Sequence, residues 1–478
     1  MPRKNERDSL DSRFVGLLLT FAILLSCGTR DSSVAGTRNA QQPSISASCS
    51  LYASPGGNDK NSGATRTSPK TFLGAAAVTR PGSVVCLLGG TYLLNSTFKP
   101  PTSGTPAAWI IYRASGDAPA KFSWTGSADA SPMFDMNGGK FPSNPAYLEF
   151  RGLTLDGGGK AGDGFFCRGS HHLRFIGNTI GNTGGSGIGT IECDYLMADH
   201  NIVDHNGYVP SDAGRSAKYY SWTSGISFNS SQWYDSYSGF HNIISNNIVT
   251  GEVDQSTKHS DGNGIILDLS DRTYNYSSAN TPPALIVNNV VYGNGGRCIE
   301  AYVVSNFWIV NNTCYGNNLD PSIGPASSIN VNNSHDGYVV NNIAVPGSTS
   351  SRCYDEENTT KNIRYYRNMC FGGSAEKSPS DPTQFIRANP VFLSPPSFRL
   401  SVKTECDEIL TPAVLGKWFI LDPKSPALHA GIDTATLPNL SETIIRDLKK
   451  YILTDINGAA RPPGGNPDLG AYQRTPGR

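Results

Sequence analysis

The sequence predicts an all-β protein whose main part is a parallel β-helix, a solenoid of short stacked strands. Two observations lead to this prediction. The chain of 478 residues contains 51 Gly and 31 Pro and lacks long runs of Ala, Leu, Glu and Lys, which excludes a mostly helical fold. In addition, an apolar strand, an Asn and a second apolar strand recur along the chain with a period near 23 residues.

The charge balance limits the functions that the chain can have. There are 39 Lys and Arg against 39 Asp and Glu, so the formal net charge is zero, and only 16% of the residues are charged. A nucleic-acid-binding protein would carry an excess of basic residues, and a disordered chain would carry fewer apolar ones. We therefore expect an ordered protein with no nucleic-acid partner.

The N-terminus has the features of an export signal. Basic residues precede the apolar run 14–25, which is too short to span a membrane as a helix. The run ends in Leu-Leu-Ser-Cys-Gly, which resembles the lipobox of bacterial lipoproteins, where the Cys (here Cys27) is lipidated. The alternative is an ordinary cleaved signal that contains Cys27. Residues 1–27 are thus predicted as a lipoprotein-type signal peptide and 28–47 as a flexible tether, in a protein that is membrane-anchored or secreted.

The repeat is carried by Asn residues that follow apolar strands. They are Asn178, Asn201, Asn247, Asn289, Asn312, Asn342 and Asn368. Most steps are 23 to 30 residues, and two longer steps imply inserted loops near 207–239 and 251–283. A coil of this length has no room for the helix of an ordinary parallel crossover, so we predict a β-helix over 121–400. The Asn side chains are expected to hydrogen-bond from coil to coil as an internal ladder.

A second strand of each coil is marked by an Ile that lies 13 residues before the repeat Asn. Ile188, Ile299 and Ile329 have this spacing. Alignment on this position places Ile226 and Ile265 in the same inward stack.

The cysteines do not form a complete set of pairs. Export permits disulfides, but removal of Cys27 from the ten cysteines leaves nine, an odd number. Cys314 and Cys370 each follow a repeat Asn by two residues, so we expect them to be small buried side chains inside the solenoid. No cysteine spacing resembles a zinc site.

Both ends of the chain resemble a known family. Residues 51–92 contain a turn at Gly57-Asn58-Asp59, a helix expected near Ser68-Pro69, and a strand around Gly90. They resemble the N-terminal cap of the pectate-lyase-like right-handed parallel β-helix superfamily. Segments 389–392, 425–431 and 455–472 resemble the closing segments of its bacterial members. The resemblance implies a cap with the first coils over 48–120, a closing segment over 401–478, and, for many relatives, polysaccharide cleavage or epimerisation.

The first insertion, 207–239, combines aromatic and basic side chains. Sugar rings stack on aromatic faces and cations attract carboxylates, so this composition suits an acidic polysaccharide. The alternative is a loop that packs on itself. Together with an outward Tyr on a neighbouring strand, the predicted substrate-binding residues are Arg215, Lys218, Tyr219, Trp222, Trp233, Tyr234 and Tyr302.

The second insertion and the strands beside it concentrate ionisable residues. With Ile265 and Ile299 inward, strand alternation sends Asp268, Glu300 and Tyr302 outward. Asp261, Asp268 and Glu300 are oxygen ligands that suit a hard cation such as calcium. Lys258, His259 and Arg297 are the predicted catalytic residues, as candidates for the base of an elimination, and the spacing does not choose between them. A solvated turn with ordinary polar residues is the alternative.

Three functions fit these patterns. The first is an extracytoplasmic polysaccharide lyase, which performs β-elimination on a uronate-containing glycan, or a related epimerase. The second is a glycoside hydrolase or transglycosylase that uses two carboxyl groups, because Asp268 and Glu300 would lie roughly 8 Å apart on adjacent strands. The third is a surface-tethered solenoid that binds glycans without catalysis.

Overall fold

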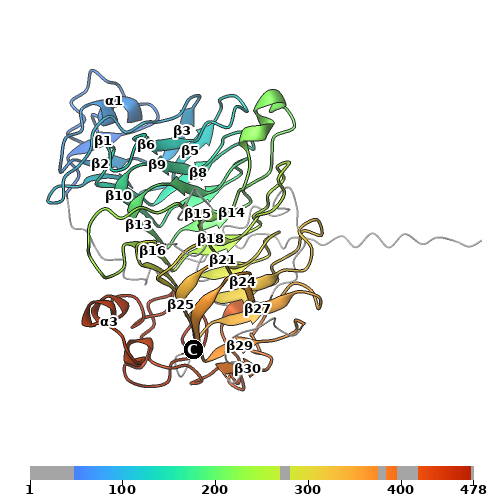
Figure 1. Ribbon diagram of the computed structural model, residues 1–478. Helices are drawn as coiled ribbons and strands as arrows, with labels where there is room; N and C mark the ends of the chain where they lie inside the picture. The colour runs from blue at the N-terminus through green and yellow to red at the C-terminus, as the bar shows by residue number, and fades with distance from the viewer. Residues whose placement is uncertain (1–47, 270–279, 375–383, 396–417, 475–478) are drawn as a thin grey trace, which may run out of the picture. The chain divides into compact units, whose positions relative to one another are not determined.

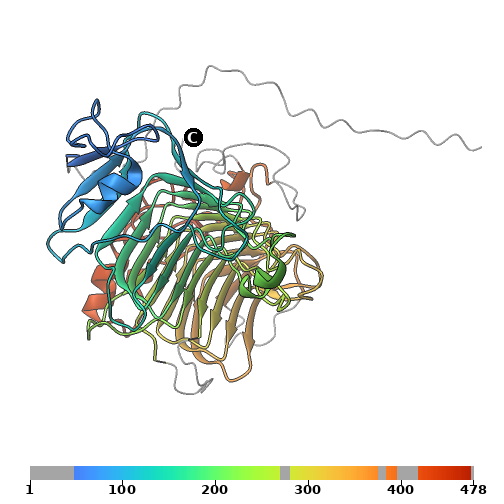
Figure 2. The ribbon, with the colours of Figure 1, turned by 90° about the horizontal axis from the view of Figure 1, so that it is seen from above.

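The computed structural model describes residues 48–269, 280–374, 384–395 and 418–474, which all belong to one compact unit, Ala40–Arg478. In these residues three parallel sheets run through stacked coils, two with 11 strands and one with eight (Figures 1 and 2). The protein is therefore a right-handed parallel β-helix, and the predicted fold class is confirmed. No helix in the described ranges has the length and apolar character needed to cross a membrane.

The three sheets take one strand each from successive coils. Sheet A contains β1 (Leu51–Ala53), β2 (Val84–Leu87), β4 (Ile110–Ala114), β7 (Leu148–Arg151), β10 (His171–Ile176), β13 (Asp194–Asp199), β16 (Asn242–Ser245), β19 (Ala284–Val287), β22 (Phe307–Val310), β25 (His335–Val340) and β28 (Lys361–Tyr366). Sheet B contains β3 (Gly90–Leu94), β5 (Ala120–Trp124), β8 (Leu153–Asp156), β11 (Thr179–Gly181), β14 (Ile202–Asp204), β17 (Ile248–Thr250), β20 (Val290–Tyr292), β23 (Thr313–Tyr315), β26 (Ile343–Val345), β29 (Asn368–Cys370) and β30 (Phe385–Arg387). Sheet C contains β6 (Phe134–Asn137), β9 (Phe165–Arg168), β12 (Ile188–Ile191), β15 (Ile226–Asn229), β18 (Ile265–Asp268), β21 (Ile299–Tyr302), β24 (Ser327–Asn332) and β27 (Arg352–Glu357).

The register of sheet C follows the predicted inward stack. Ile188, Ile226, Ile265, Ile299 and Ile329 are paired in turn across neighbouring strands, and all are buried. Alternation along each strand therefore directs every second residue to the outer face, as the sequence predicts.

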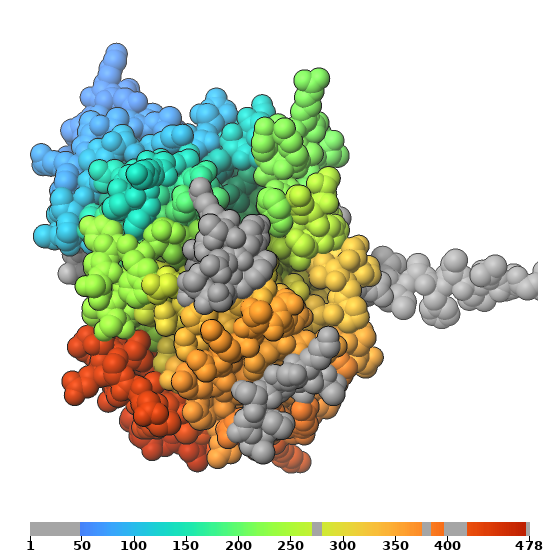
Figure 3. All heavy atoms as spheres, viewed as in Figure 1, coloured from blue at the N-terminus to red at the C-terminus, as the bar shows by residue number. Residues whose placement is uncertain are grey.

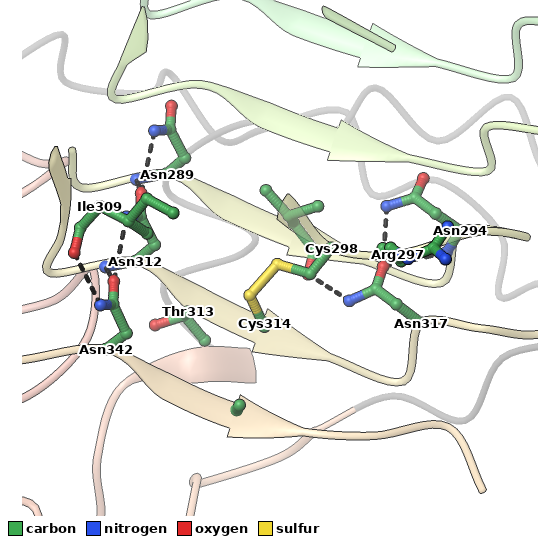
Figure 4. Close-up of a disulfide and its surroundings, with 12 residues drawn as sticks. Asn289, Asn294, Arg297, Cys298, Ile309, Asn312, Thr313, Cys314, Asn317 and Asn342 are labelled. Carbon is green, nitrogen blue, oxygen red and sulfur yellow. Dashed lines mark hydrogen bonds between the residues drawn. A yellow bond between two sulfur atoms is a disulfide. The ribbon is translucent and has the colours of Figure 1, made fainter. Parts of the chain in front are cut away.

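The repeat Asn residues form the expected ladder between sheets A and B. Asn312 shows the pattern: its side chain accepts from Asn289, and its Nδ2 donates to Asn342 Oδ1 at 3.0 Å (Figure 4). The same Nδ2 also donates to the carbonyl of Ile286 at 3.0 Å. The same bonds recur from Asn178 to Asn368. Each buried amide is thus satisfied by the next coil, which fixes the register of the stack.

The expectation for the buried cysteines is wrong in one respect. Cys314 and Cys370 are buried, but Cys314 forms a disulfide with Cys298 (Figure 4) and Cys370 forms one with Cys353. Two further disulfides, Cys49–Cys86 and Cys167–Cys193, link other coils. Cys298 and Cys353 lie just before or on strands of sheet C, and Cys314 and Cys370 lie on strands of sheet B, so these two pairs meet across the interior, a relation that sequence spacing does not reveal. Cys27 and Cys406 lie outside the described residues.

A short helix covers the N-terminal end of the stack. Helix α1 (Phe72–Ala77) begins after Thr71, whose hydroxyl accepts the N–H of Gly74 as an N-cap. Phe72 enters the interior and its ring lies 4.8 Å from that of Phe122. The helix thereby closes the first coil, as expected from the family resemblance.

The C-terminal segment packs on the outer faces of two sheets. Phe419, Leu469 and neighbouring residues form an apolar cluster with the outward side chains of sheet B. The 3₁₀ helix η3 (Thr434–Thr436) and helix α3 (Glu442–Leu448) contribute to a second cluster on sheet A, where Leu448 packs. Among the described residues, these two apolar clusters pack on sheets A and B and include no residue of sheet C.

Candidate functional site

The outer face of sheet C carries a row of polar side chains. Asn229, Asp268 and Tyr302 are paired across β15, β18 and β21, as the sequence predicts. Ser227 and Glu300 lie two residues earlier on their strands, in the neighbouring outward row. Asn229 Nδ2 donates to Asp268 Oδ2 at 2.6 Å, so these two neighbours in the row are hydrogen-bonded to each other.

Strand β15 divides the first insertion into two loops, one at each end of the strand. The loop before β15 includes the 3₁₀ helix η1 (Gly214–Tyr219) and stands out at the upper right of Figure 3. It is held in place by Tyr220, whose hydroxyl accepts the N–H of Ala130 at 2.8 Å and donates to the carbonyl of Lys160 at 2.7 Å. The loop after β15 lies beyond the other end of the strand. The predicted single aromatic site is therefore split.

A pocket of about 270 Å³ lies between the η1 loop and the strands of sheet C. Its floor includes Ser227 and Asn229, and Asp268 lies at one end. Tyr219 and Trp222 contribute to its wall while remaining 64% and 55% exposed. The combination of hydroxyl and amide groups with exposed aromatic rings suits a sugar residue, which presents both hydroxyls and apolar ring faces.

Asp268 is a carboxyl group of this pocket whose pKa is strongly shifted. Burial and the nearby charge of Glu300 raise the pKa of Asp268 to about 7. The hydrogen bond from Asn229 works against this shift but is weaker than the other two effects. Asp268 is thus partly protonated near neutral pH, as a general acid must be.

The other two predicted acidic residues lie next to Asp268 but have different surroundings. Burial, followed by the charges of Glu300 and Asp268, raises the pKa of Asp261 well above its usual value. Burial also raises the pKa of Glu300, although Arg297 partly offsets the effect. The Oε2 atom of Glu300 accepts from Asn263 Nδ2 at 3.0 Å and lies 3.5 Å from the Arg297 guanidinium. Glu300 is therefore held by protein groups instead of facing the pocket.

The three predicted calcium ligands are not gathered into one group of metal ligands in the described part of the chain. Within the described ranges, no three His, Cys, Asp or Glu residues are placed close enough to hold one metal ion. Asp261, Asp268 and Glu300 influence one another electrostatically but do not form such a group. We therefore derive no step through a metal, and calcium stays a prediction from the sequence.

The three predicted bases each have a partner of their own, and none of them lines the pocket. The ammonium of Lys258 is 5.1 Å from the centre of the Trp222 ring, a cation–π distance, and the side chain is exposed. His259 Nε2 is 2.7 Å from Asp320 Oδ2, so that residue orients the imidazole. Arg297 is paired with Glu300 and, because a guanidinium keeps its proton in proteins, serves to neutralise a carboxylate.

The remaining predicted substrate residues do not converge. Arg215 and Lys218 are exposed on η1, where Lys218 lies 4.9 Å over the ring of Tyr219. Trp233 and Tyr234 lie in the loop after β15, and the ring of Tyr234 is 4.2 Å from that of His171, the first residue of β10 in sheet A. Neither of them lines the pocket.

Sequence reasoning missed one carboxyl group of the pocket, Asp163. It precedes β9, and its Oδ1 accepts the N–H of Ser186 at 2.5 Å. Burial raises the pKa of Asp163 to about 7. Asp163 also occupies the repeat position of Arg297, two residues before the inward residue of the strand, and this alignment is the signal that could have found it.

Comparison with known proteins adds information about the fold only. No protein-family model matches the chain, and no curated protein sequence matches it either. Solved structures do match. The likeness is one of fold. Pectate lyase Pel9A has 16% identity and a TM-score of 0.45, and the match covers 89% of this chain and 96% of that one.

Two other solved structures resemble the chain over a smaller part of its length. A glycoside hydrolase has 10% identity and a TM-score of 0.48, with 68% of this chain and 94% of that one covered. An alginate lyase from Paenibacillus sp. strain FPU-7 has 18% identity and a TM-score of 0.37, with 62% and 83% covered. These similarities concern the fold and identify no activity for this chain.

Proposed function

We propose that the protein hydrolyses a glycosidic bond of a polysaccharide in the pocket on sheet C, with Asp268 as the general acid. The observation that carries this proposal is the carboxyl group of Asp268, which lies at one end of a sugar-sized pocket and has a pKa raised to about 7. Glycoside hydrolases require such a group, because the oxygen of the leaving sugar must receive a proton as its bond to the anomeric carbon breaks.

The surroundings of Asp268 support this role. The hydroxyl of Ser227 and the amide of Asn229 belong to the outer face of sheet C, line the pocket and can hydrogen-bond to sugar hydroxyls. The exposed ring of Trp222 offers a stacking surface at the wall. The charge of Glu300 helps to keep the proton on Asp268, and a negative charge beside the pocket stabilises the positive charge of an oxocarbenium-like transition state.

A second candidate is β-elimination on a uronate, the reaction that the sequence alone favours. One observation supports it: Lys258 lies beside Trp222 at the wall of the pocket, where a cation can meet a uronate carboxylate. His259, oriented by Asp320, is near enough in sequence to be considered as the base. Calcium belongs to this candidate, and loss of elimination on chelation would support both together.

The two reactions give different products from the same experiment. The purified protein is incubated with a panel of neutral, acidic and amino-sugar polysaccharides. Hydrolysis yields new reducing ends without ultraviolet absorbance, whereas elimination yields an unsaturated uronate that absorbs. New reducing ends that disappear in Asp268→Asn support the proposal. An absorbing product from wild type replaces it with elimination, and no product from any polysaccharide rejects both.

A further inference from the structure

Two glycines, Gly185 and Gly189, leave space around the carboxyl group of Asp163. A Cβ atom on Gly185 would lie 2.6 Å from Asp163 Oδ1, and one on Gly189 would lie 3.1 Å from its Cγ. Both glycines line the pocket, as does Gly162, the residue before Asp163. Any side chain at Gly185 would therefore displace the carboxyl group. The glycines keep one face of it accessible from the pocket, which a purely structural carboxylate does not require.

Asp163 and Asp268 lie in the same pocket but on different coils. The Asp163 carboxyl reaches the level of β12, where Gly189 lies, and Asp268 lies two strands further along sheet C. Two strand spacings and an offset of two residues along the strand put roughly 12 Å between these two backbone positions. The Asp268 carboxyl leans back toward β15, where it accepts from Asn229, and this brings it closer to Asp163. Retaining glycosidases separate their two carboxyls by only about 5 Å, whereas inverting ones need about 6.5–9.5 Å to admit a water molecule.

From this geometry we infer that Asp163 is the second catalytic carboxyl group and acts as the general base of an inverting hydrolysis. The inference rests on the proposed hydrolysis and goes further by naming the base and the stereochemistry. Asp163 takes a proton from a water molecule, whose oxygen bonds to the anomeric carbon. The bond from that carbon to the leaving oxygen breaks, and the leaving oxygen takes the proton of Asp268. One water is consumed, the anomeric configuration inverts, and exchange with solvent resets both carboxyl groups.

Glu300, the partner of Asp268 that the sequence suggests, is less suitable for this role. Glu300 is 5% exposed, its Oε2 is bound by Asn263 and lies 3.5 Å from Arg297, and it does not line the pocket. A base must reach a water molecule next to the substrate. Asp163 lines the pocket and Glu300 does not, so a comparison of the two residues is a direct test.

The test uses an aryl glycoside of the sugar identified in the polysaccharide screen. Wild type, Asp163→Gly, Asp163→Asn, Glu300→Gln and the control Asp117→Asn are compared with and without sodium azide. Asp117 is exposed and paired with Arg66 at 2.9 Å, away from the pocket. Asp163→Gly is expected to lose at least about 100-fold in turnover, since a general base typically contributes 10²- to 10⁴-fold. Azide should restore turnover and form a glycosyl azide of inverted configuration.

The outcomes separate this inference from the proposed function. Turnover by both Asp163 variants above a tenth of wild type overturns the inference while hydrolysis stands. Azide rescue of Glu300→Gln instead of Asp163→Gly does the same, as does a wild-type product that retains its configuration by NMR. Loss of turnover without azide rescue, in a variant that unfolds at the wild-type temperature, also overturns the role as base. Absence of hydrolysis by wild type rejects the proposed function and this inference together.

Discussion

The substitution Asp268→Asn is expected to stabilise the folded protein at neutral pH while abolishing hydrolysis. Burial and the charge of Glu300 raise the pKa of Asp268 from the usual 3.8 to about 7. The folded state therefore binds this proton more tightly than the unfolded state does. The contribution of this group to the free energy of unfolding is largest below about pH 4, falls as the pH rises towards 7, and stays at the lower level above pH 7.

The size of the effect follows from the two pKa values. A difference between 3.8 and about 7, at about 1.4 kcal/mol for each pH unit, makes the ionisation of Asp268 cost the folded state roughly 4 kcal/mol at pH 8. Asn has the same shape and keeps an oxygen that accepts from Asn229, so no buried donor loses its partner. The stability of Asp268→Asn relative to wild type should thus rise by up to about 4 kcal/mol between pH 4 and pH 8.

Urea denaturation at pH 4, 6 and 8 measures this difference for wild type, Asp268→Asn and the control Asp117→Asn. The salt bridge with Arg66 and the hydroxyl of Ser115 lower the pKa of Asp117, so its substitution should not produce a gain that grows with pH. Turnover of Asp268→Asn on the polysaccharide should fall by about 10²- to 10⁴-fold in parallel. Denaturation midpoints of wild type and Asp268→Asn that change equally with pH would refute the raised pKa and with it the acid role.

Four further predictions address the pocket, the ladder and the N-terminus. The kcat/KM of hydrolysis should follow a bell centred near pH 7 and fall roughly 25-fold by pH 5 and pH 9, because one of Asp163 and Asp268 must be protonated and the other ionised, and both have pKa values of about 7. A pH profile that is flat from 5 to 9 would contradict this. Trp222→Ala should raise KM by up to about tenfold with kcat unchanged, as steady-state kinetics would show, because a stacking surface worth about 1 kcal/mol is lost. Asn312→Ala should lower the free energy of unfolding by about 3–6 kcal/mol, since several buried partners lose a hydrogen bond, and a loss below 1 kcal/mol in urea titration would count against the ladder. Cys27→Ala should release the protein from the membrane fraction, and unchanged attachment in a fractionation blot would argue against lipidation.

The fold could be predicted from the sequence because a β-helix repeats one set of contacts in every coil. The Asn at the end of each strand, such as Asn201 or Asn289, appears at a regular spacing since each binds the next. The inward Ile residues repeat for the same reason, and their register then places Asp268 beside Asn229 and Tyr302 correctly. Local periodicity is enough where every contact is with the adjacent coil.

The disulfides and the division of the aromatic insertion could not be predicted in this way. Cys298 and Cys314 belong to different strands of one coil and meet across its interior, so their pairing depends on the cross-section of the solenoid. Trp222 and Tyr234 are only twelve residues apart, but β15 runs between them, so the two residues lie beyond opposite ends of that strand. Closeness in sequence within an insertion thus gives no assurance of closeness in space when a strand divides it.

The pocket shows how such a solenoid can build a site from its own repeat. Asp163, Ser186, Asn263 and Arg297 occupy one position of the turn that leads into sheet C, in successive or nearby coils. Ser186 and Asn263 use this position for a contact with the next or the previous coil, as most ladder residues do. A carboxyl group at the same position keeps one such contact, through the Ser186 N–H, and still exposes a second oxygen where glycines replace the side chains of the neighbouring coil. The stability of the repeat thereby fixes the carboxyl group in place, and a change of side chain at a single turn position is sufficient to convert a structural contact into a reactive group directed at the pocket.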